Sequence, residues 1–368
     1  MTVCPSGTFT RPRRVSNTRM SLPLSILDLV PVPEGSGSTQ AIRNSVALAQ
    51  AGERAGYARY WIAEHHNTVS VVSAAPEVLL AVVATQTERI RVGSGGIMLP
   101  NHAPLRVAEA FCTLEALAPG RIDLGIGRAP GTDGVTALAL RGSQEALHRD
   151  DLPDQLAELR AYAGEEGYFP AGHPLGAVRA SPQDVPLPPI YLLGSSTYSA
   201  QLAAQLGYGF AFAYHFSAAH AEQAMTLYRQ NFRPSATLQK PHAILATVAV
   251  AADTEAEAGR LSSSIGLSFL NIRRGLREKI PSPETAMAYP YTAQERAFIE
   301  SYAATHSVGT PEQVRGSLKA LAVRYGADEL MITAGLHCPA ARIRSYELIA
   351  GAFGLGQTGE MRQAVLSG

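Results

Sequence analysis

The stretch "AGYARYWIAEHH", residues 55–66, contains the unit that decides the fold. A helical pattern ends at Gly56, a continuous apolar run follows, and the run ends in an acid and two histidines. Glycine closes the last turn of a helix because it accepts the left-handed conformation. An apolar run without alternation is typical of a strand buried on both faces of a parallel sheet. The unit recurs around Gly207 in "LGYGFAFAYH" and around Gly326 in "RYGADELMIT".

Apolar runs of this kind alternate with helical patterns along the chain. Amphipathic spacing predicts helices over residues 41–54 and 105–118. Thr310, Pro311 and Gln313 predict a further helix that begins with a capping box. The eight expected strands are 23–30, 58–63, 90–99, 121–127, 189–194, 209–214, 243–250 and 328–333. Eight strands alternating with helices favour an α/β fold of the (β/α)8 TIM barrel type, with a doubly wound open sheet as the alternative.

The chain has 368 residues, which exceeds the roughly 250 residues of a typical barrel. The surplus follows the fourth and seventh strands, at residues 149–188 and 261–306. We therefore expect one barrel domain over residues 21–355 with two insertions, the second of which is a lid. Residues 1–20 are expected to be a disordered tail and residues 356–368 a C-terminal tail.

The composition excludes several classes of function. The 31 basic and 31 acidic residues balance, whereas a nucleic-acid binder needs a basic field. No apolar run approaches the roughly 20 residues that span a bilayer. The three cysteines have no CxxC spacing, which fits a reducing compartment and excludes a cysteine-built metal site. We expect a cytoplasmic protein without a nucleic-acid or membrane partner.

Polar residues follow the expected strands at their carboxyl ends. In a barrel these ends meet at one rim, and that rim holds the active site. The residues concerned are Asp28, Glu64 to His66, Arg128, Gly194 to Ser196, and Tyr214 with His215.

Ser195 and Ser196 stand between a strand and a helix in "LLGSSTYSAQLAAQLG". Free amides and a positive dipole at a helix start bind anions, although the serines could also be simple N-caps. Arg128 at the end of the preceding strand favours a phosphate, because guanidinium and phosphate pair bidentately.

His65 and His66 are adjacent, so on a strand they point to opposite faces and do not easily share one metal ion. One imidazole can then face the rim and carry a proton near neutral pH, and the other can be structural. Glu64 is expected to orient an imidazole or to pair with an arginine. Gly95 and Gly96 interrupt a buried run, which indicates a bulge or the close approach of a flat ligand.

Four segments together resemble the bacterial luciferase-like flavin-dependent monooxygenases. They are "RYWIAEHHN", "IRVGSGGIMLPNHAPLRVAEAF", "TLEALAPGRIDLGIGRAPGTD" and "LLGSSTYSAQLAAQLG". The start "LSILDLVP" and the end "GADELMITAGLHCPAARIRSYELIA" resemble an alkanal monooxygenase-like subgroup. The resemblance implies a (β/α)8 barrel, FMN as its reduced form FMNH2, and a homodimer.

The resemblance also assigns roles to residues. The histidine of flavin and oxygen chemistry falls on His65, with His66 beside it. The flavin-binding positions fall on Gly95 and Gly96 for a non-proline cis peptide under the ring, on Arg128, Gly194, Ser195 and Ser196 with Tyr198 or Ser199 for the phosphate, and on Tyr214 as a ring neighbour.

The function implied is oxygenation by FMNH2 and O2 of a small, apolar organic substrate, an aldehyde or an aromatic compound. The chain has no nicotinamide-binding unit, so a separate NAD(P)H-dependent flavin reductase is the expected partner. The alternatives are a deazaflavin (F420)-dependent oxidoreductase of the same fold, a non-catalytic flavin-binding protein, and a barrel metallohydrolase.

Overall fold

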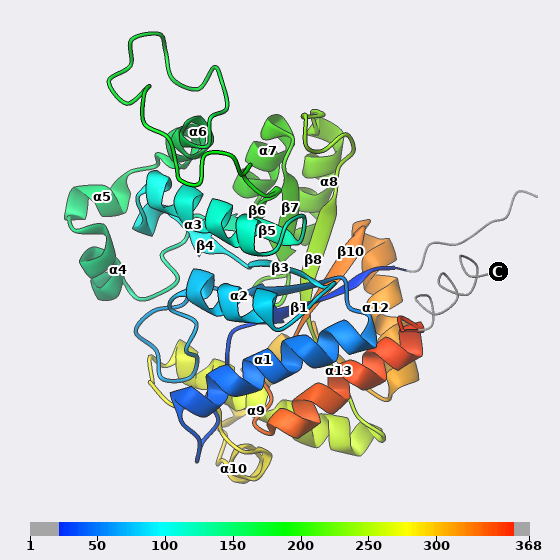
Figure 1. Ribbon diagram of the computed structural model, residues 1–368. Helices are drawn as coiled ribbons and strands as arrows, with labels where there is room; N and C mark the ends of the chain where they lie inside the picture. The colour runs from blue at the N-terminus through cyan, green and yellow to red at the C-terminus, as the bar shows by residue number, and fades with distance from the viewer. Residues whose placement is uncertain (1–21, 357–368) are drawn as a thin grey trace, which may run out of the picture.

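The computed structural model describes residues 22–356. The expected tail at residues 1–20, and all but the first residue of the tail at 356–368, lie outside the described part. Eight parallel strands pair side by side in the order β10-β1-β2-β3-β5-β6-β7-β8, and β8 pairs with β10 to close the ring (Figure 1). The predicted (β/α)8 TIM barrel is confirmed. Its strands are β1 (Leu24–Asp28), β2 (Arg59–Ile62), β3 (Arg91–Ser94), β5 (Ile122–Gly127), β6 (Ile190–Gly194), β7 (Gly209–Ala213), β8 (Ala243–Ala251) and β10 (Glu329–Thr333).

The helices on the outside of the barrel terminate where the sequence predicts. The left-handed glycines Gly56, Gly207 and Gly326 close α1, α7 and α12, and Thr310 forms the expected capping box with Gln313. The helices outside the two insertions are α1 (Ser38–Ala55), α2 (Pro76–Thr85), α3 (Pro104–Leu117), α7 (Thr197–Leu206), α8 (Ala221–Asn231), α12 (Pro311–Tyr325) and α13 (Pro339–Phe353). Between residues 22 and 356, no helix has both the length and the apolar character needed to cross a membrane.

The expected strand 90–99 is broken in two. The peptide between Gly95 and Gly96 is cis, and it separates β3 from the short β4 (Ile97–Met98), which pairs with β5. A three-residue strand that the sequence did not predict, β9 (Ser307–Gly309), extends the pairing of β8. Both departures lie at the carboxyl end of the barrel, where the backbone leaves the regular ladder.

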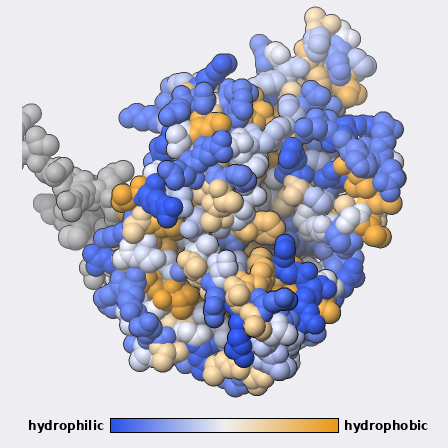
Figure 2. Space-filling view, turned by 180° about the vertical axis from the view of Figure 1, so that it is seen from behind, coloured by the Kyte–Doolittle hydropathy of each residue, from blue (hydrophilic) through white to orange (hydrophobic). Residues whose placement is uncertain are grey.

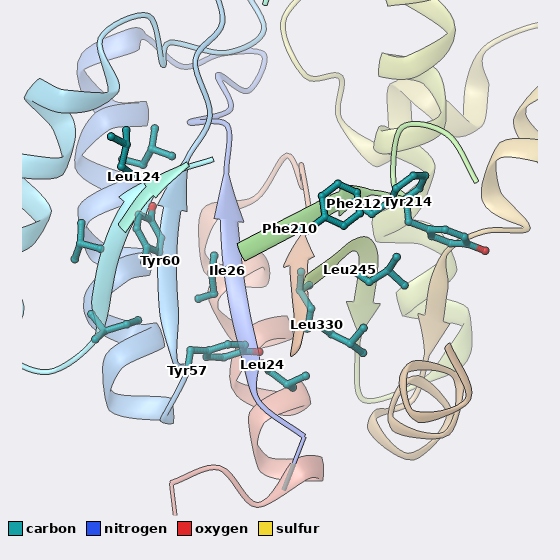
Figure 3. Close-up of a cluster of buried hydrophobic side chains, with 14 of the residues drawn as sticks. Leu24, Ile26, Tyr57, Tyr60, Leu124, Phe210, Phe212, Tyr214, Leu245 and Leu330 are labelled. Atoms are coloured by element: carbon teal, nitrogen blue, oxygen red, sulfur yellow. The ribbon is translucent and has the colours of Figure 1, made fainter. Parts of the chain in front are cut away.

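The core has two layers because side chains alternate along each strand. The outward layer packs the strands against the helices and contains Leu24, Ile26, Phe210, Phe212 and Leu245 (Figure 3). The smaller inward cluster fills the barrel with Leu27, Trp61, Tyr191, Ala211, Ile244 and Met331.

A buried ionic cluster closes the amino end of the barrel. Arg59, the first residue of β2, contacts Glu329 at 2.9 Å and Asp123 at 2.8 Å. The indole N–H of Trp61 also donates to Asp123, at 3.1 Å. Buried charges are stable only when they are paired, and this pairing drives the pKa of Glu329 down to about 2 against the effect of burial, chiefly through Arg59.

The two insertions extend the chain beyond a minimal barrel. The first, between β5 and β6, carries α4 (Gly134–Arg141), α5 (Gln144–His148), α6 (Leu152–Tyr162) and a long loop. The second, between β8 and β9, carries α9 (Glu255–Arg273), α10 (Pro283–Ala288) and α11 (Ala293–Ala303). In each insertion the first helix, α4 or α9, closely follows the preceding strand. The face turned away in Figure 1 is hollowed near its centre, with hydrophilic and hydrophobic residues at the border (Figure 2).

Candidate functional site

Glu64 organises the loop that follows β2. Its buried carboxylate lies 2.8 Å from Nε2 of His66 and 2.9 Å from Nε2 of His102, and it accepts the backbone N–H of Met98 at 2.8 Å. Burial raises the pKa of this carboxyl, but the hydrogen bonds from His102 and His66 outweigh burial and lower it below its usual range. Glu64 is therefore ionised and orients two imidazoles.

His65 differs from His66 in having a free ring nitrogen. Nδ1 of His65 is buried and has no hydrogen-bond partner within residues 22–356. Burial lowers the pKa of His65 to about 4, helped by repulsion from His215. A neutral imidazole with one unpaired nitrogen can accept or donate a proton at that atom. The two histidines thus differ: Nε2 of His66 contacts Glu64, whereas the buried Nδ1 of His65 has no partner in the described part of the chain.

His215 supplies a second buried imidazole at the carboxyl end of the barrel. It follows β7, and its Nδ1 lies 3.1 Å from the carbonyl oxygen of Ala246 on β8. Burial lowers its pKa below the usual range. β2 and β7 stand four places apart in the eight-stranded ring, so they are on opposite sides of the barrel. The proximity of His215 is the second of the causes that lower the pKa of His65, after burial.

His306 adds a third imidazole from the second insertion. It stands just before β9, its Nε2 is buried without a partner in the described part of the chain, and burial with repulsion from His215 lowers its pKa to about 4. The sequence analysis did not select His306, because its place depends on how the insertion folds back. The described residues contain no group of three or more His, Cys, Asp or Glu side chains arranged to hold a metal ion.

Glycines line the backbone beside these histidines. A Cβ on Gly96 would lie 2.6 Å from the carbonyl oxygen of Gly125, and a Cβ on Gly125 would lie 2.0 Å from that of Ser94. A Cβ on Gly95 would meet Leu27 at 2.5 Å. Side chains are excluded here, and the backbone carbonyl of Gly96 accepts the N–H of Glu64 at 3.3 Å. The cis peptide is thereby joined to the histidine loop.

The residues expected to bind a phosphate lie near the end of β5 and the start of α7. The guanidinium carbon of Arg128 lies 4.3 Å above the ring of Tyr198, and its Nη1 lies 3.6 Å from the carboxylate of Asp150. Ser196 begins α7 without any side-chain cap, so the first amides of the helix remain free. A Cβ on Gly194 would meet Oγ of Ser199 at 2.6 Å, so a side chain has no room at this position of the turn.

Tyr214 packs on the outside of the barrel. It belongs to the outward layer (Figure 3), and its ring centroid lies 5.3 Å from that of Tyr325 on α12. Phe210 and Phe212 point outward from β7, and alternation carries Tyr214 to the same side. Tyr214 thus packs toward α12, and alternation turns the next residue, His215, to the other side. That Tyr214 borders a flavin ring stays a prediction.

Asp28 is also turned away from the rim. It lies on the outward face of β1, fully buried, where it accepts hydrogen bonds from Arg342 at 2.7 Å and from the backbone N–H of Val30 at 2.8 Å. Its pKa lies below the usual range because Arg342 and two hydroxyl donors outweigh burial. Asp28 fixes α13 against the barrel and is not a site residue.

The comparison with known proteins covers most of the chain, including the residues of this site. The model of the luciferase-like monooxygenase family matches residues 22–329. The chain belongs to this family. It is 44% identical over 335 residues to the protein YvbT of Bacillus subtilis, covering 91% of this chain and 98% of the relative. It is 43% identical over 331 residues to a luciferase-like monooxygenase of Escherichia coli, covering 90% and 97%. The N-acetyl-S-alkylcysteine monooxygenase of Bacillus subtilis is 36% identical over 332 residues, covering 89% and 97%.

Solved structures agree with the barrel. Apo-MsnO8 is similar to this luciferase-like protein with a TM-score of 0.83 and 37% identity, over 91% of this chain and 99% of that chain. The oxygenating constituent of 3,6-diketocamphane monooxygenase from Pseudomonas putida, in complex with FMN, gives a TM-score of 0.67 over 90% and 98% of the two chains. Its 22% identity shows a shared fold alone. The narrower alkanal monooxygenase-like subgroup is not specifically supported by these matches.

Proposed function

We propose that this protein is a monooxygenase that uses FMNH2 and O2 to oxygenate a small organic substrate. The observation that carries the proposal is that two buried imidazoles, those of His65 and His215, stand at the carboxyl end of the barrel, after β2 and after β7. Beside them lie a glycine-lined cis turn and an anion site. The names of several relatives and neighbours, among them N-acetyl-S-alkylcysteine monooxygenase and an FMN-bound oxygenating constituent, support the same reaction class.

The anion site suits the phosphate of FMN. Arg128 would supply the guanidinium, and Gly194, Ser195 and Ser196 would supply backbone amides and hydroxyls at the start of α7, with Tyr198 holding Arg128 in place. Asp150 pairs only weakly with Arg128, because both side chains are about half exposed. A dianionic phosphate would therefore replace Asp150 as the partner of Arg128.

The ring of the flavin would lie against the backbone of Gly95 and Gly96, which carry no side chains of their own. Bound reduced flavin supplies the electrons that activate O2 for transfer of one oxygen atom to the substrate. The chain's own contribution begins with His65, whose unpaired Nδ1 would take or give the proton that this transfer requires. His66 would act as a positioning residue, because Glu64 holds it and so fixes the loop that presents His65.

Residues 261–306 would form a lid over the site. Arg277 donates to Asn67 at 3.0 Å and reaches Asp133 at 3.4 Å, which joins the insertion to the loops after β2 and β5. Ile280 pairs with the loop after β1, through hydrogen bonds of 2.9 Å to Val32 and Glu34. A cover that spans three such loops excludes water, and a reactive oxygen-transfer site requires that exclusion.

The partners would be a separate flavin reductase and a second copy of the chain. Between residues 22 and 356, every strand belongs to the barrel or pairs with it, so the described part has no second sheet for a nicotinamide cofactor. FMNH2 must then come from another NAD(P)H-dependent enzyme. The homodimer is inferred from the family resemblance, and the expected compartment remains the cytoplasm.

Anaerobic titration tests the choice of cofactor. Purified protein is titrated with FMNH2, FMN, riboflavin and reduced F420, and binding is followed by flavin fluorescence. The FMNH2 complex is then mixed with 18O2 and a panel of aldehydes, aromatic compounds and N-acetyl-S-alkylcysteines. Label in the organic product supports the proposal. Substrate reduction by the deazaflavin without O2, and no labelled product with FMNH2, would show a hydride-transfer enzyme instead.

A further inference from the structure

We propose that His306 binds the substrate through its Nε2, by hydrogen bonding to a carbonyl or hydroxyl oxygen of an otherwise apolar molecule. This inference rests on the proposed function, since it names the substrate class of that site. His306 is carried by the second insertion and not by a barrel strand, so the lid itself would take part in substrate recognition.

The first support is the unpaired nitrogen. Buried polar atoms in proteins nearly always have a partner, and each exception requires an explanation. Nε2 of His306 is buried without one in the described part of the chain. The neutral ring can donate or accept at this atom, and burial keeps the ring neutral, with a pKa of about 4. A ligand oxygen would satisfy the atom and would remove the cost of leaving it unpaired.

The second support is the fixed position of the ring. The edge of His306 packs on Tyr302, with ring centroids 4.4 Å apart and planes at 82°. Tyr302 in turn stacks on Phe269 of α9, with centroids 3.8 Å apart and planes at 12°. This stack aligns the imidazole before any ligand arrives. Tyr302, with Phe269 behind it, supplies aromatic surface next to the imidazole, which suits a substrate with a single oxygen function on an apolar body.

The third support is the location. His215 donates its backbone N–H to Ala246 of β8 at 2.9 Å, and Ser307, the residue after His306, pairs with Ala249 of the same strand. His65, His215 and His306 therefore all stand at the carboxyl end of the barrel, after β2, after β7 and just before β9. An oxygen-bearing substrate held by His306 would therefore lie on the same side of the barrel as Nδ1 of His65.

The test compares matched probes on flavin-free protein. The pairs are octanal against octane, and 2-naphthaldehyde against naphthalene, with dissociation constants from ligand-observed NMR. The wild type should bind each aldehyde at least tenfold more tightly than its hydrocarbon, which is about 1.4 kcal/mol and the size of one net hydrogen bond. His306→Leu should reduce that ratio to near one. A wild-type ratio near one, or an unchanged ratio in His306→Leu, would overturn the inference.

Two conservative variants make the test specific to the atom. The amide of glutamine reaches the position of Nε2, whereas that of asparagine reaches only Nδ1. His306→Gln should therefore keep most of the aldehyde preference and His306→Asn should lose it, and the opposite order would contradict the assignment to Nε2. The exposed His220, at the start of α8, gives the control His220→Leu, which should behave as wild type.

Flavin binding on the same proteins separates the two proposals. FMN affinity should be equal in the wild type and in all His306 variants. If neither the wild type nor any His306 variant binds FMN, the proposed function fails. The ratio of the dissociation constants of hydrocarbon and aldehyde still decides the role of His306. If FMN binds and the ratio is near one, only the role of His306 fails.

Discussion

The carboxylate of Glu64 and Nε2 of His66 lie 2.8 Å apart, although the two residues are separated by a single position in the chain. That position is His65, whose Nδ1 has no hydrogen-bond partner among residues 22–356. The loop after β2 therefore folds so that the imidazole of His66 contacts Glu64 whereas that of His65 does not. This division underlies the roles proposed for the two histidines.

Replacing Glu64 with Gln should destabilise the fold. The amide group of Gln supplies a donor where Met98 N–H and the imidazoles of His66 and His102 need an acceptor, and all of these groups are at least partly buried. We expect a loss of about 2–4 kcal/mol in the free energy of unfolding, measured with urea. Exposed Glu88→Gln is the control, and equal stability of the two variants would exclude the hub role of Glu64.

Arg128 should govern discrimination between FMN and riboflavin, which lacks the phosphate. The wild type should bind FMN more tightly, and Arg128→Gln should lose most of that preference, by about 10- to 100-fold in dissociation constant. Riboflavin affinity should hardly change. A variant that weakens both flavins equally would place Arg128 outside the phosphate site.

Gly125 should not tolerate alanine. The added Cβ would lie 2.0 Å from the carbonyl oxygen of Ser94, so the backbone of two neighbouring strands must move. We expect a loss of about 3 kcal/mol in stability together with loss of FMN binding. Gly316→Ala is a matched control, because it stands inside α12 with no atom within 4 Å and should gain about 0.5–1 kcal/mol. Similar behaviour of the two variants would contradict the packing.

The free histidines should make stability depend on pH. His65 and His306 have folded pKa values of about 4, while unfolded histidine has about 6.5. Between these values the unfolded chain binds protons that the folded chain does not, so stability should fall as pH drops from 6.5 to 4. Urea unfolding at several pH values should show a shallower slope for His65→Asn and for His306→Gln. An unchanged slope in both would contradict burial of neutral imidazoles.

Arg277 should hold the lid without stabilising the whole fold. Its side chain is more than half exposed, so Arg277→Ala should cost less than about 0.5 kcal/mol. Limited proteolysis within residues 261–306 should nevertheless become faster. Arg344, in a comparable exposed pair with Asp253, supplies the control Arg344→Ala. Unchanged cleavage in the Arg277 variant would show that other contacts hold the segment.

The barrel could be predicted because its signals are local. The closing glycines, the capping box at Thr310 and the unbroken apolar runs each act within a few residues, and all were confirmed. The break at Gly95 was expected only through the family resemblance, because a glycine pair alone does not distinguish a bulge from a cis peptide.

The site was harder to predict because it depends on side-chain direction and on distant contacts. In "FAFAYH", large residues alternate with alanines, and the crowded interior takes the alanines. That parity sends Tyr214 outward, where its ring packs beside that of Tyr325 on α12. His306 has no local signal, since its neighbours Tyr302 and Phe269 belong to a fold-back of the second insertion.

The salt-bridged base of the barrel, built on Arg59, Glu329 and Asp123, has a consequence for the order of events during turnover. Because the barrel is closed at this end, the cofactor, O2, the substrate and the product would all enter and leave at the other end. Whichever molecule sits deepest must arrive first and depart last. Opening of the lid would then set the pace of each catalytic cycle, because it would release the product and admit the next molecule of reduced cofactor.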